Sequence, residues 1–196
     1  SLYFQQLIKN HPNSPLVPDS YLAMGEQNFE QHKISEALKA YKAAIKYKKH
    51  RAYPYMIYKL GWAYFNATPK NPADELLLRK KAVMSFKLVV QLSKSKKRKY
   101  GRYDLREEAL KDLIMVWADA EDVDSAWVYF RKLGSPEYFF TMLAQLGNLY
   151  AEQGKHKKGI RVFRRLLKEA PMRKSSFESA SSLARLYEVQ NNFKSL

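Results

Sequence analysis

Apolar and small residues recur along the chain in a pattern that fits one face of a helix. Each copy has an apolar residue, then a residue that is usually small, then a residue three positions later that is usually large. The five copies are Met24-Gly25-Asn28, Leu60-Gly61-Tyr64, Leu113-Ile114-Trp117, Leu146-Gly147-Tyr150 and Leu183-Ala184-Tyr187. Residues three or four apart share one side of a helix, and a small residue there lets a neighbouring helix approach closely. The pattern therefore predicts helices that cross their neighbours at the small residue.

A second pattern, a small residue followed by an aromatic one four positions later, alternates with the first. It occurs at Ala37 and Tyr41, Ala82 and Phe86, Ala126 and Phe130, and Gly159 and Phe163. The small residues of the two patterns lie 12 positions apart in three cases and 21 apart in the fourth, where Asn66 to Pro72 reads as an inserted loop. The alternation predicts antiparallel helix pairs, with the four small residues buried at helix crossings.

The periodicity predicts eleven helical segments, the last one a stub. They lie near 1–11, 16–31, 34–48, 52–66, 73–93, 102–120, 123–133, 137–153, 156–169, 175–190 and 193–196. The composition agrees, because 7 Gly and 8 Pro are too few for a chain of tight β-turns, and good helix formers dominate the long segments. Two stretches, 66–74 and 94–102, break the spacing, and we expect both to be surface loops or short helical extensions.

The two patterns together resemble the tetratricopeptide repeat (TPR), in which helices A and B pack antiparallel and recur about every 34 residues. The match is best at 140–173, where nine residues stand where the family has such types. These are Leu143, Leu146, Gly147, Tyr150, Gly154, Gly159, Phe163, Leu166 and Pro171. The resemblance implies an all-α fold, a right-handed superhelical solenoid of antiparallel helix pairs.

We expect one solenoid over 1–196 with about five repeats, cut from a longer protein. Its units are 1–14 as a half repeat, 18–53, 54–106 with insertions, 107–139, 140–176 and a partial 177–196. The first unit reads as a lone helix B, although Leu2 to Gln5 also fits a protease-site scar. If flanking repeats are missing, the apolar residues at the two ends lose a neighbour and should be partly exposed. These residues are Phe4, Leu7, Ile8, Leu183, Leu186 and Tyr187.

Residues 3–26 resemble one group of proteins within this family. A helix B there runs into His11-Pro12-Asn13-Ser14, and another helix A follows after a short gap. The segment is similar to TPR proteins of Gram-negative envelopes, such as outer-membrane assembly lipoproteins and the periplasmic coordinators of the Tol–Pal system. The resemblance implies a periplasmic or envelope-associated scaffold, with a cytoplasmic location as the alternative. No apolar stretch approaches the ~20 residues that cross a bilayer.

Nothing in the sequence points to catalysis, a metal or a cofactor. The four histidines have no partner at metal-ligand spacing, and the chain has no cysteine. A glycine-rich phosphate loop and a nucleophile elbow are also absent from the sequence. We therefore expect a non-catalytic protein without a cofactor.

The TPR resemblance implies that a partner segment binds in the groove lined by the A helices. The unit beginning at Pro54 has the most aromatic lining, with Tyr55, Tyr58, Trp62 and Phe65 on one stripe. The corresponding candidates in other units are Glu26, Lys111, Asn148 and Arg185. Lys111 and Asn148 have the residue types of the family's carboxylate clamp but do not complete its set. Packing against the adjacent repeat or the inserted loop is the alternative role of the four aromatic residues.

The net charge of +16 adds a second candidate surface. Its densest part is Lys94, Lys96, Lys97, Arg98, Lys99 and Arg102. Further cations, Lys157, Arg161, Arg164 and Lys168 among them, fall on predicted B helices. Such a face is commonly only solvated, but it can also attract an acidic protein, an anionic lipid surface or nucleic acid. The sequence thus predicts a scaffold for a protein or peptide partner in a bacterial envelope complex, with nucleic-acid binding through the basic face as the alternative.

Overall fold

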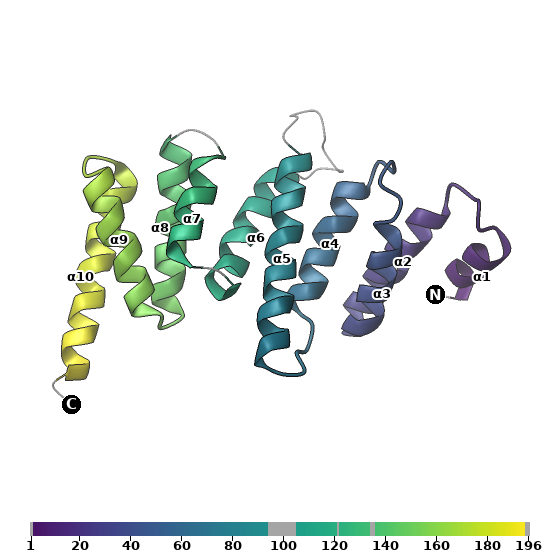
Figure 1. The fold of residues 1–196 in the computed structure, drawn as a ribbon, viewed down its shortest axis with the longest axis horizontal. Helices are drawn as coiled ribbons and strands as arrows, with labels where there is room; N and C mark the ends of the chain where they lie inside the picture. The colour runs from purple at the N-terminus through teal and green to yellow at the C-terminus, as the bar shows by residue number, and fades with distance from the viewer. Residues whose placement is uncertain (1, 94–104, 121, 134–135, 195–196) are drawn as a thin grey trace. The chain divides into compact units, whose positions relative to one another are not determined.

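The computed structural model describes residues 2–93, 105–120, 122–133 and 136–194, and within these ranges it holds ten α-helices and no strand (Figure 1). The helices are α1 (Leu2–Asn10), α2 (Val17–Glu30), α3 (Ile34–Ala44), α4 (Tyr53–Phe65), α5 (Pro72–Leu92), α6 (Leu105–Ala120), α7 (Val123–Arg131), α8 (Pro136–Glu152), α9 (His156–Glu169) and α10 (Lys174–Lys194). The all-α prediction is confirmed. In the described part of the chain, no helix is long and apolar enough to span a bilayer.

The helix boundaries follow local sequence signals. Pro72 opens α5, and the side chain of Asn71 caps it by accepting a hydrogen bond from the Asp74 amide at 2.9 Å. Residues 66–71 therefore form a loop, and the predicted insertion at 66–74 ends as the first turn of a helix. The other predicted insertion, at 94–102, lies outside the described residues together with the six basic residues assigned to it.

Two helix pairs turn through the left-handed backbone region at the same position of the repeat. His32 has a φ of 58° between α2 and α3, and Gly154 has a φ of 70° between α8 and α9. Each lies seven residues after the small residue of its helix A, Gly25 or Gly147. Glycine takes this conformation freely, whereas a residue with a Cβ is strained there. These two turns thus share a left-handed residue, and the residue type that prefers this conformation is present only in the second.

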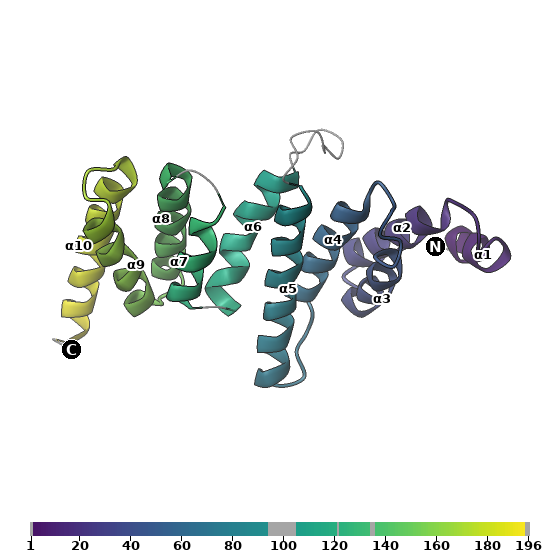
Figure 2. The ribbon, with the colours of Figure 1, turned by 45° about the horizontal axis from the view of Figure 1, so that its top comes forward.

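The chain divides into two compact units, residues 1–116 and 117–196, with the boundary inside α6. In the first unit α2 packs against α3 and α4 against α5, while α1 lies on α2 and α3 on α4 (Figures 1 and 2). Each pair meets at the predicted small residue. A Cβ placed on Gly61 would lie 3.2 Å from the ring of Phe86, and one on Gly25 would overlap the ring of Tyr41.

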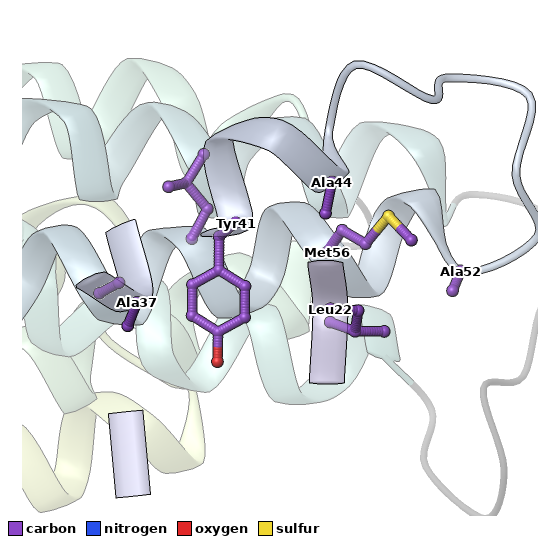
Figure 3. Close-up of a cluster of buried hydrophobic side chains, with 8 residues drawn as sticks. Leu22, Ala37, Tyr41, Ala44, Ala52 and Met56 are labelled. Atoms are coloured by element: carbon purple, nitrogen blue, oxygen red, sulfur yellow. The ribbon is translucent and has the colours of Figure 1, made fainter. Parts of the chain in front are cut away.

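The α2–α3 pair and the start of α4 share one apolar cluster (Figure 3). Tyr41 and Ala37 from α3 are fully buried, and they pack with Leu22 from α2 and Met56 from α4. Burial of such side chains supplies about 25 cal/mol for each Å² of apolar surface removed from water. The cluster therefore joins one helix pair to the next.

In the second unit α8 packs against α9 and α10 packs against both of them, while α7 lies on α8. A Cβ placed on Gly147 would lie 2.6 Å from the ring of Phe163, which repeats the contact of the first unit. The four small residues of the second sequence pattern, Ala37, Ala82, Ala126 and Gly159, are all buried. The predicted TPR-like solenoid of helix pairs is thereby confirmed as the fold class.

The predicted exposure of the apolar end residues is right with one exception. Five of the six are partly exposed: Phe4, Leu7, Ile8, Leu183 and Tyr187. For Leu186 the prediction was wrong, because only 5% of it is exposed. Its Cδ1 atom packs on α9, 3.1 Å from where a Cβ on Gly159 would lie. The predicted break between 190 and 193 was also wrong, since α10 runs without interruption from Lys174 to Lys194.

Candidate functional site

The predicted aromatic stripe, Tyr55, Tyr58, Trp62 and Phe65, forms on α4. The spacing of three, four and three residues places the rings along one side of the helix, and each side chain is half-buried. The rings of Tyr55 and Tyr58 stack with centroids 6.2 Å apart, and those of Trp62 and Phe65 meet edge to face at 5.8 Å. The stripe thus consists of two ring pairs that keep part of their area accessible.

Helix α5 packs against the stripe. The ring of Phe86 is fully buried and meets Tyr58 and Trp62 edge to face, with centroids 5.6 and 5.7 Å away. The guanidinium of Arg79 lies over the ring of Phe65 at 4.4 Å and donates a hydrogen bond to the Phe65 carbonyl. Edge-to-face rings and stacked cations each favour one orientation. The aromatic surface is therefore held in place by its own helix pair.

The polar ends of the stripe reach the neighbouring A helices on both sides. The hydroxyl of Tyr55 donates to Glu26 Oε1 on α2 at 2.9 Å. On the other side, the hydroxyl of Tyr58 donates to Asp112 Oδ2 on α6 at 2.6 Å, and Trp62 Nε1 donates to the same oxygen at 3.1 Å. Helices α2, α4 and α6 thus share one surface in the first unit, which we call the A-helix face.

Asp112 is a carboxyl group that sequence reasoning did not single out. Burial raises its pKa above the ordinary value, and hydrogen bonds from Tyr58 and Trp62 only partly counter that effect. Burial, followed by the bond to Asp112, also raises the pKa of Tyr58. At neutral pH Tyr58 therefore keeps its proton and acts as the donor to Asp112.

A repeat position explains how Asp112 reaches the stripe. Successive A helices contact each other through a fixed pair of positions. On the first helix it is the residue directly after the small-residue position. On the following helix it is the residue two places before that position. Three such contacts are present: Lys59 with Glu26 at 3.6 Å, Asp112 with Trp62 at 3.1 Å, and Ser182 with Asn148 at 3.0 Å. The structure thus defines a fixed offset between successive A helices, and applied to Trp62 this offset points to Asp112.

The other predicted groove residues differ in their surroundings. Glu26 joins the stripe through Tyr55 and Lys59. Lys111 is exposed and pairs with Glu108 on its own helix at 3.2 Å, so the structure does not bring it into the stripe. Arg185 is exposed on α10 in the second unit.

Asn148 lies in the second unit beside a shallow polar depression of about 440 Å³ between α8 and α10. The depression is also lined by Gln145, Arg173 and Glu178, and Asn148 itself accepts the hydrogen bond from Ser182. Across the described residues, no group of three His, Cys, Asp or Glu side chains is placed to hold a metal ion.

Comparison with known proteins supports the repeat assignment. Residues 143–171, which span most of α8 and α9, match the tetratricopeptide repeat family model. No curated protein matches the chain. The match and the paired helices together support a tetratricopeptide repeat protein.

Proposed function

We propose that this chain is a non-catalytic scaffold that binds a segment of a partner protein on the A-helix face of its first unit. The aromatic stripe carries this proposal. Large rings that are fixed in orientation and partly accessible are typical anchors of protein interfaces, because they bury much apolar area at little entropic cost. A tetratricopeptide repeat suggests protein–protein interaction as the general role.

The charges beside the stripe indicate the chemistry of the partner. Glu26 and Asp112 border it, and Glu108 lies one helical turn before Asp112. Glu26 and Glu108 already pair with Lys59 and Lys111, at 3.6 and 3.2 Å. Asp112 has no cationic partner within 4 Å among the described residues, although Lys111 lies near enough to lower its pKa slightly. We therefore expect the bound segment to carry a lysine or arginine next to an apolar or aromatic residue.

Tryptophan fluorescence can test this site in the full chain. Trp117 and Trp127 are fully buried, at 0% and 1% exposed, whereas Trp62 is half-buried. Acrylamide should therefore quench mainly Trp62. Peptides selected from a displayed random library should reduce this quenching when they bind, and the selected sequences should share a basic and an apolar position. Peptides that bind tightly and leave the quenching unchanged would place the binding site elsewhere.

We also propose an envelope complex as the setting, on the resemblance of residues 3–26 to envelope scaffolds. Fractionation of the native bacterium, followed by detection of the chain with an antibody, tests this setting separately from the site. Recovery with the periplasmic or membrane fractions is the expected result. Recovery in the cytoplasmic fraction would contradict the envelope setting and leave the partner-binding proposal to its own test.

A further inference from the structure

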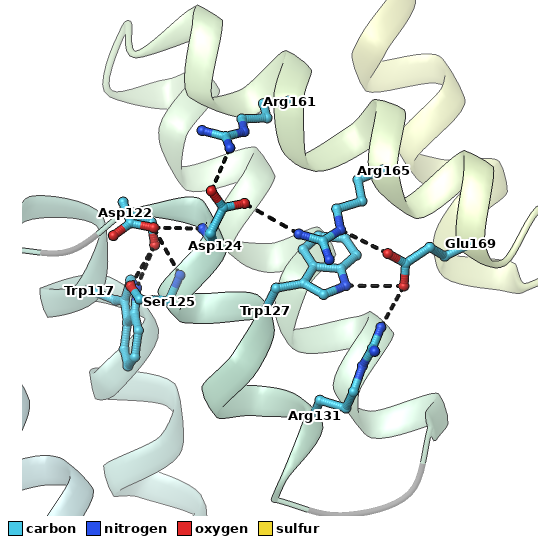
Figure 4. Close-up of polar contacts among 9 residues, drawn as sticks. All are labelled: Trp117, Asp122, Asp124, Ser125, Trp127, Arg131, Arg161, Arg165 and Glu169. Carbon is cyan, nitrogen blue, oxygen red and sulfur yellow. Dashed lines mark hydrogen bonds and ion pairs between the residues drawn. The ribbon is translucent and has the colours of Figure 1, made fainter.

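Helices α7 and α9 are joined by a network of ion pairs (Figure 4). Asp124 on α7 accepts from Arg161 at 2.5 Å and from Arg165 at 3.3 Å. Glu169 at the end of α9 accepts from Arg165 at 2.8 Å and from Arg131 at 2.7 Å. Arginine holds carboxylates well because its planar group presents several donors at once. The network therefore fixes the outer side of α9 against α7.

An aromatic ring lies under the same network. The guanidinium of Arg165 is 4.3 Å from the ring of Trp127, whose Nε1 donates to Glu169 at 3.1 Å. Burial raises the pKa of Glu169, but the hydrogen bonds from Arg165 and Trp127 outweigh it, so that the pKa lies below the ordinary value. Glu169 is thus ionised at neutral pH and is bound by Trp127, Arg131 and Arg165. Both carboxylates of the network, Asp124 and Glu169, therefore already have arginine partners.

Other cations of α9 lie in a row along the helix and have no carboxylate partner in the described part of the chain. Every exposed residue of this helix is charged: Lys157, Lys158, Arg161, Arg164, Lys168 and Glu169. Lys157, Arg164 and Lys168 have no ion-pair partner among the described residues. With Arg161, they recur at intervals of four, three and four residues, which keeps them on one side of the helix. The row spans about 16 Å.

A shallow depression of about 710 Å³ follows this row. Ile160 and the cations Lys157, Arg161, Arg164, Arg165 and Lys168 line it, with Glu169 at one end. We propose that this depression, which is distinct from the A-helix face, binds an acidic segment of a partner protein. An extended segment of about six residues covers the row at about 3.3 Å per residue.

The surface itself favours carboxylates over other polyanions. Arg161 and Arg165 bind the carboxylates of Asp124 and Glu169, so the guanidinium groups on this surface already accept carboxylate partners. Nucleic-acid recognition in single strands relies on accessible aromatic rings for base stacking, but Trp127 is only 1% exposed beneath Arg165. Insertion into a bilayer needs an apolar side chain beside the cations, and α9 exposes none. An acidic protein segment is the partner that the described residues fit best.

The test is fluorescence anisotropy with three probes on the full chain. The first is a labelled peptide of about eight residues, rich in Glu and Asp, to cover the row with a margin. The second is a labelled oligothymidylate of equal charge, and the third a vesicle of phosphatidylcholine and phosphatidylserine. The variant is K157E/R164E/K168E, which spares the three arginines of the network, Arg131, Arg161 and Arg165. The matched control is K46E/K48E/K49E, which changes the net charge equally at three exposed lysines of the first unit.

We expect the peptide to bind, the α9 variant to lose about tenfold or more in affinity, and the control to change less than about twofold. Circular dichroism should show the same helix content for all three proteins. Equal losses of peptide affinity in both variants would show that net charge alone causes the effect, and would overturn the proposal. A peptide that does not bind would also overturn it. Tighter binding of the oligonucleotide or the vesicle, lost in the same α9 variant, would assign the row to that partner class instead.

Discussion

Trp62 and Asp112 are joined by a hydrogen bond in which the indole Nε1 on α4 donates to Oδ2 on α6 across 3.1 Å. The hydroxyl of Tyr58 donates to the same oxygen at 2.6 Å. One carboxyl oxygen therefore orients two rings of the aromatic stripe, and it does so from a helix about fifty residues further along the chain. This contact links the stability of the first unit to the shape of its proposed binding surface.

Two replacements of Asp112 should distinguish the contribution of its hydrogen bonds to stability from the contribution of its charge. Asp112→Ala leaves the Tyr58 hydroxyl and the Trp62 N–H without their acceptor and should cost about 1–3 kcal/mol. Asp112→Asn keeps an acceptor and removes the partly buried charge, so it should be far less harmful. Urea unfolding followed by circular dichroism measures both variants. An Asp112→Ala protein as stable as the parent would show that the contact contributes nothing.

The pH dependence of the Asn variant provides a separate prediction. Because burial raises the pKa of Asp112, the folded state holds this proton more tightly than the unfolded state. The contribution of Asp112 to stability is then complete below its unfolded pKa and is lost as the pH rises through the folded pKa. Relative to Asp112→Asn, the parent should lose stability between acid and neutral pH. A stability difference between the two proteins that stays constant over this range would contradict the raised pKa.

The left-handed positions predict opposite effects of two substitutions. His32→Gly should stabilise the chain by roughly 0.5 kcal/mol, because the strain of a left-handed histidine exceeds the entropic cost of glycine. Gly154→Ala should destabilise it by about 1 kcal/mol through backbone conformation alone, since an added Cβ has no atom within 4 Å. Thermal unfolding of the two variants checks the pair, and effects of the same sign would refute the shared explanation.

Two glycines of the first unit provide a matched test of helix crossing. A Cβ on Gly25 would overlap the ring of Tyr41, which is fully buried and cannot move into solvent. A Cβ on Gly61 meets Ser85 and Phe86 at 3.1 and 3.2 Å, a tight contact that small shifts relieve. Gly25→Ala should therefore cost about 1–3 kcal/mol. Gly61→Ala should be nearly neutral, because alanine favours the helix by about 1 kcal/mol. Urea unfolding should rank the two variants in this order, and the reverse order would contradict the packing described here.

The helix pairs could be predicted from the sequence because their signals are local. Ala37 and Ala126 mark close crossings through residue type and a spacing of four to an aromatic residue, and both are fully buried. The stripe on α4 follows from spacing in the same way. Leu186 was predicted incorrectly because its burial depends on the depth to which α10 packs against Gly159 of the preceding helix.

The contacts between successive A helices could be predicted only in part. Glu26 was chosen for its position in the repeat, and it does contact Tyr55. Asp112 was overlooked because its contact with Trp62 depends on the register between α4 and α6, which a long interval of sequence separates. The structure gives that register through three equivalent contacts, so the offset can now be applied to the sequences of other repeats of this kind.

The most direct measurement of the proposed function is a pair of titrations on Trp62→Ala, one for binding of a library-selected peptide and one for unfolding. Trp62→Phe, which keeps a ring beside Phe86 and Phe65, is the matched control. If the stripe is a binding surface, Trp62→Ala should weaken binding by ~2 kcal/mol or more, with only a modest loss of stability. Unchanged affinity with a loss of ~3–5 kcal/mol in stability would make Trp62 a packing residue and would contradict the site.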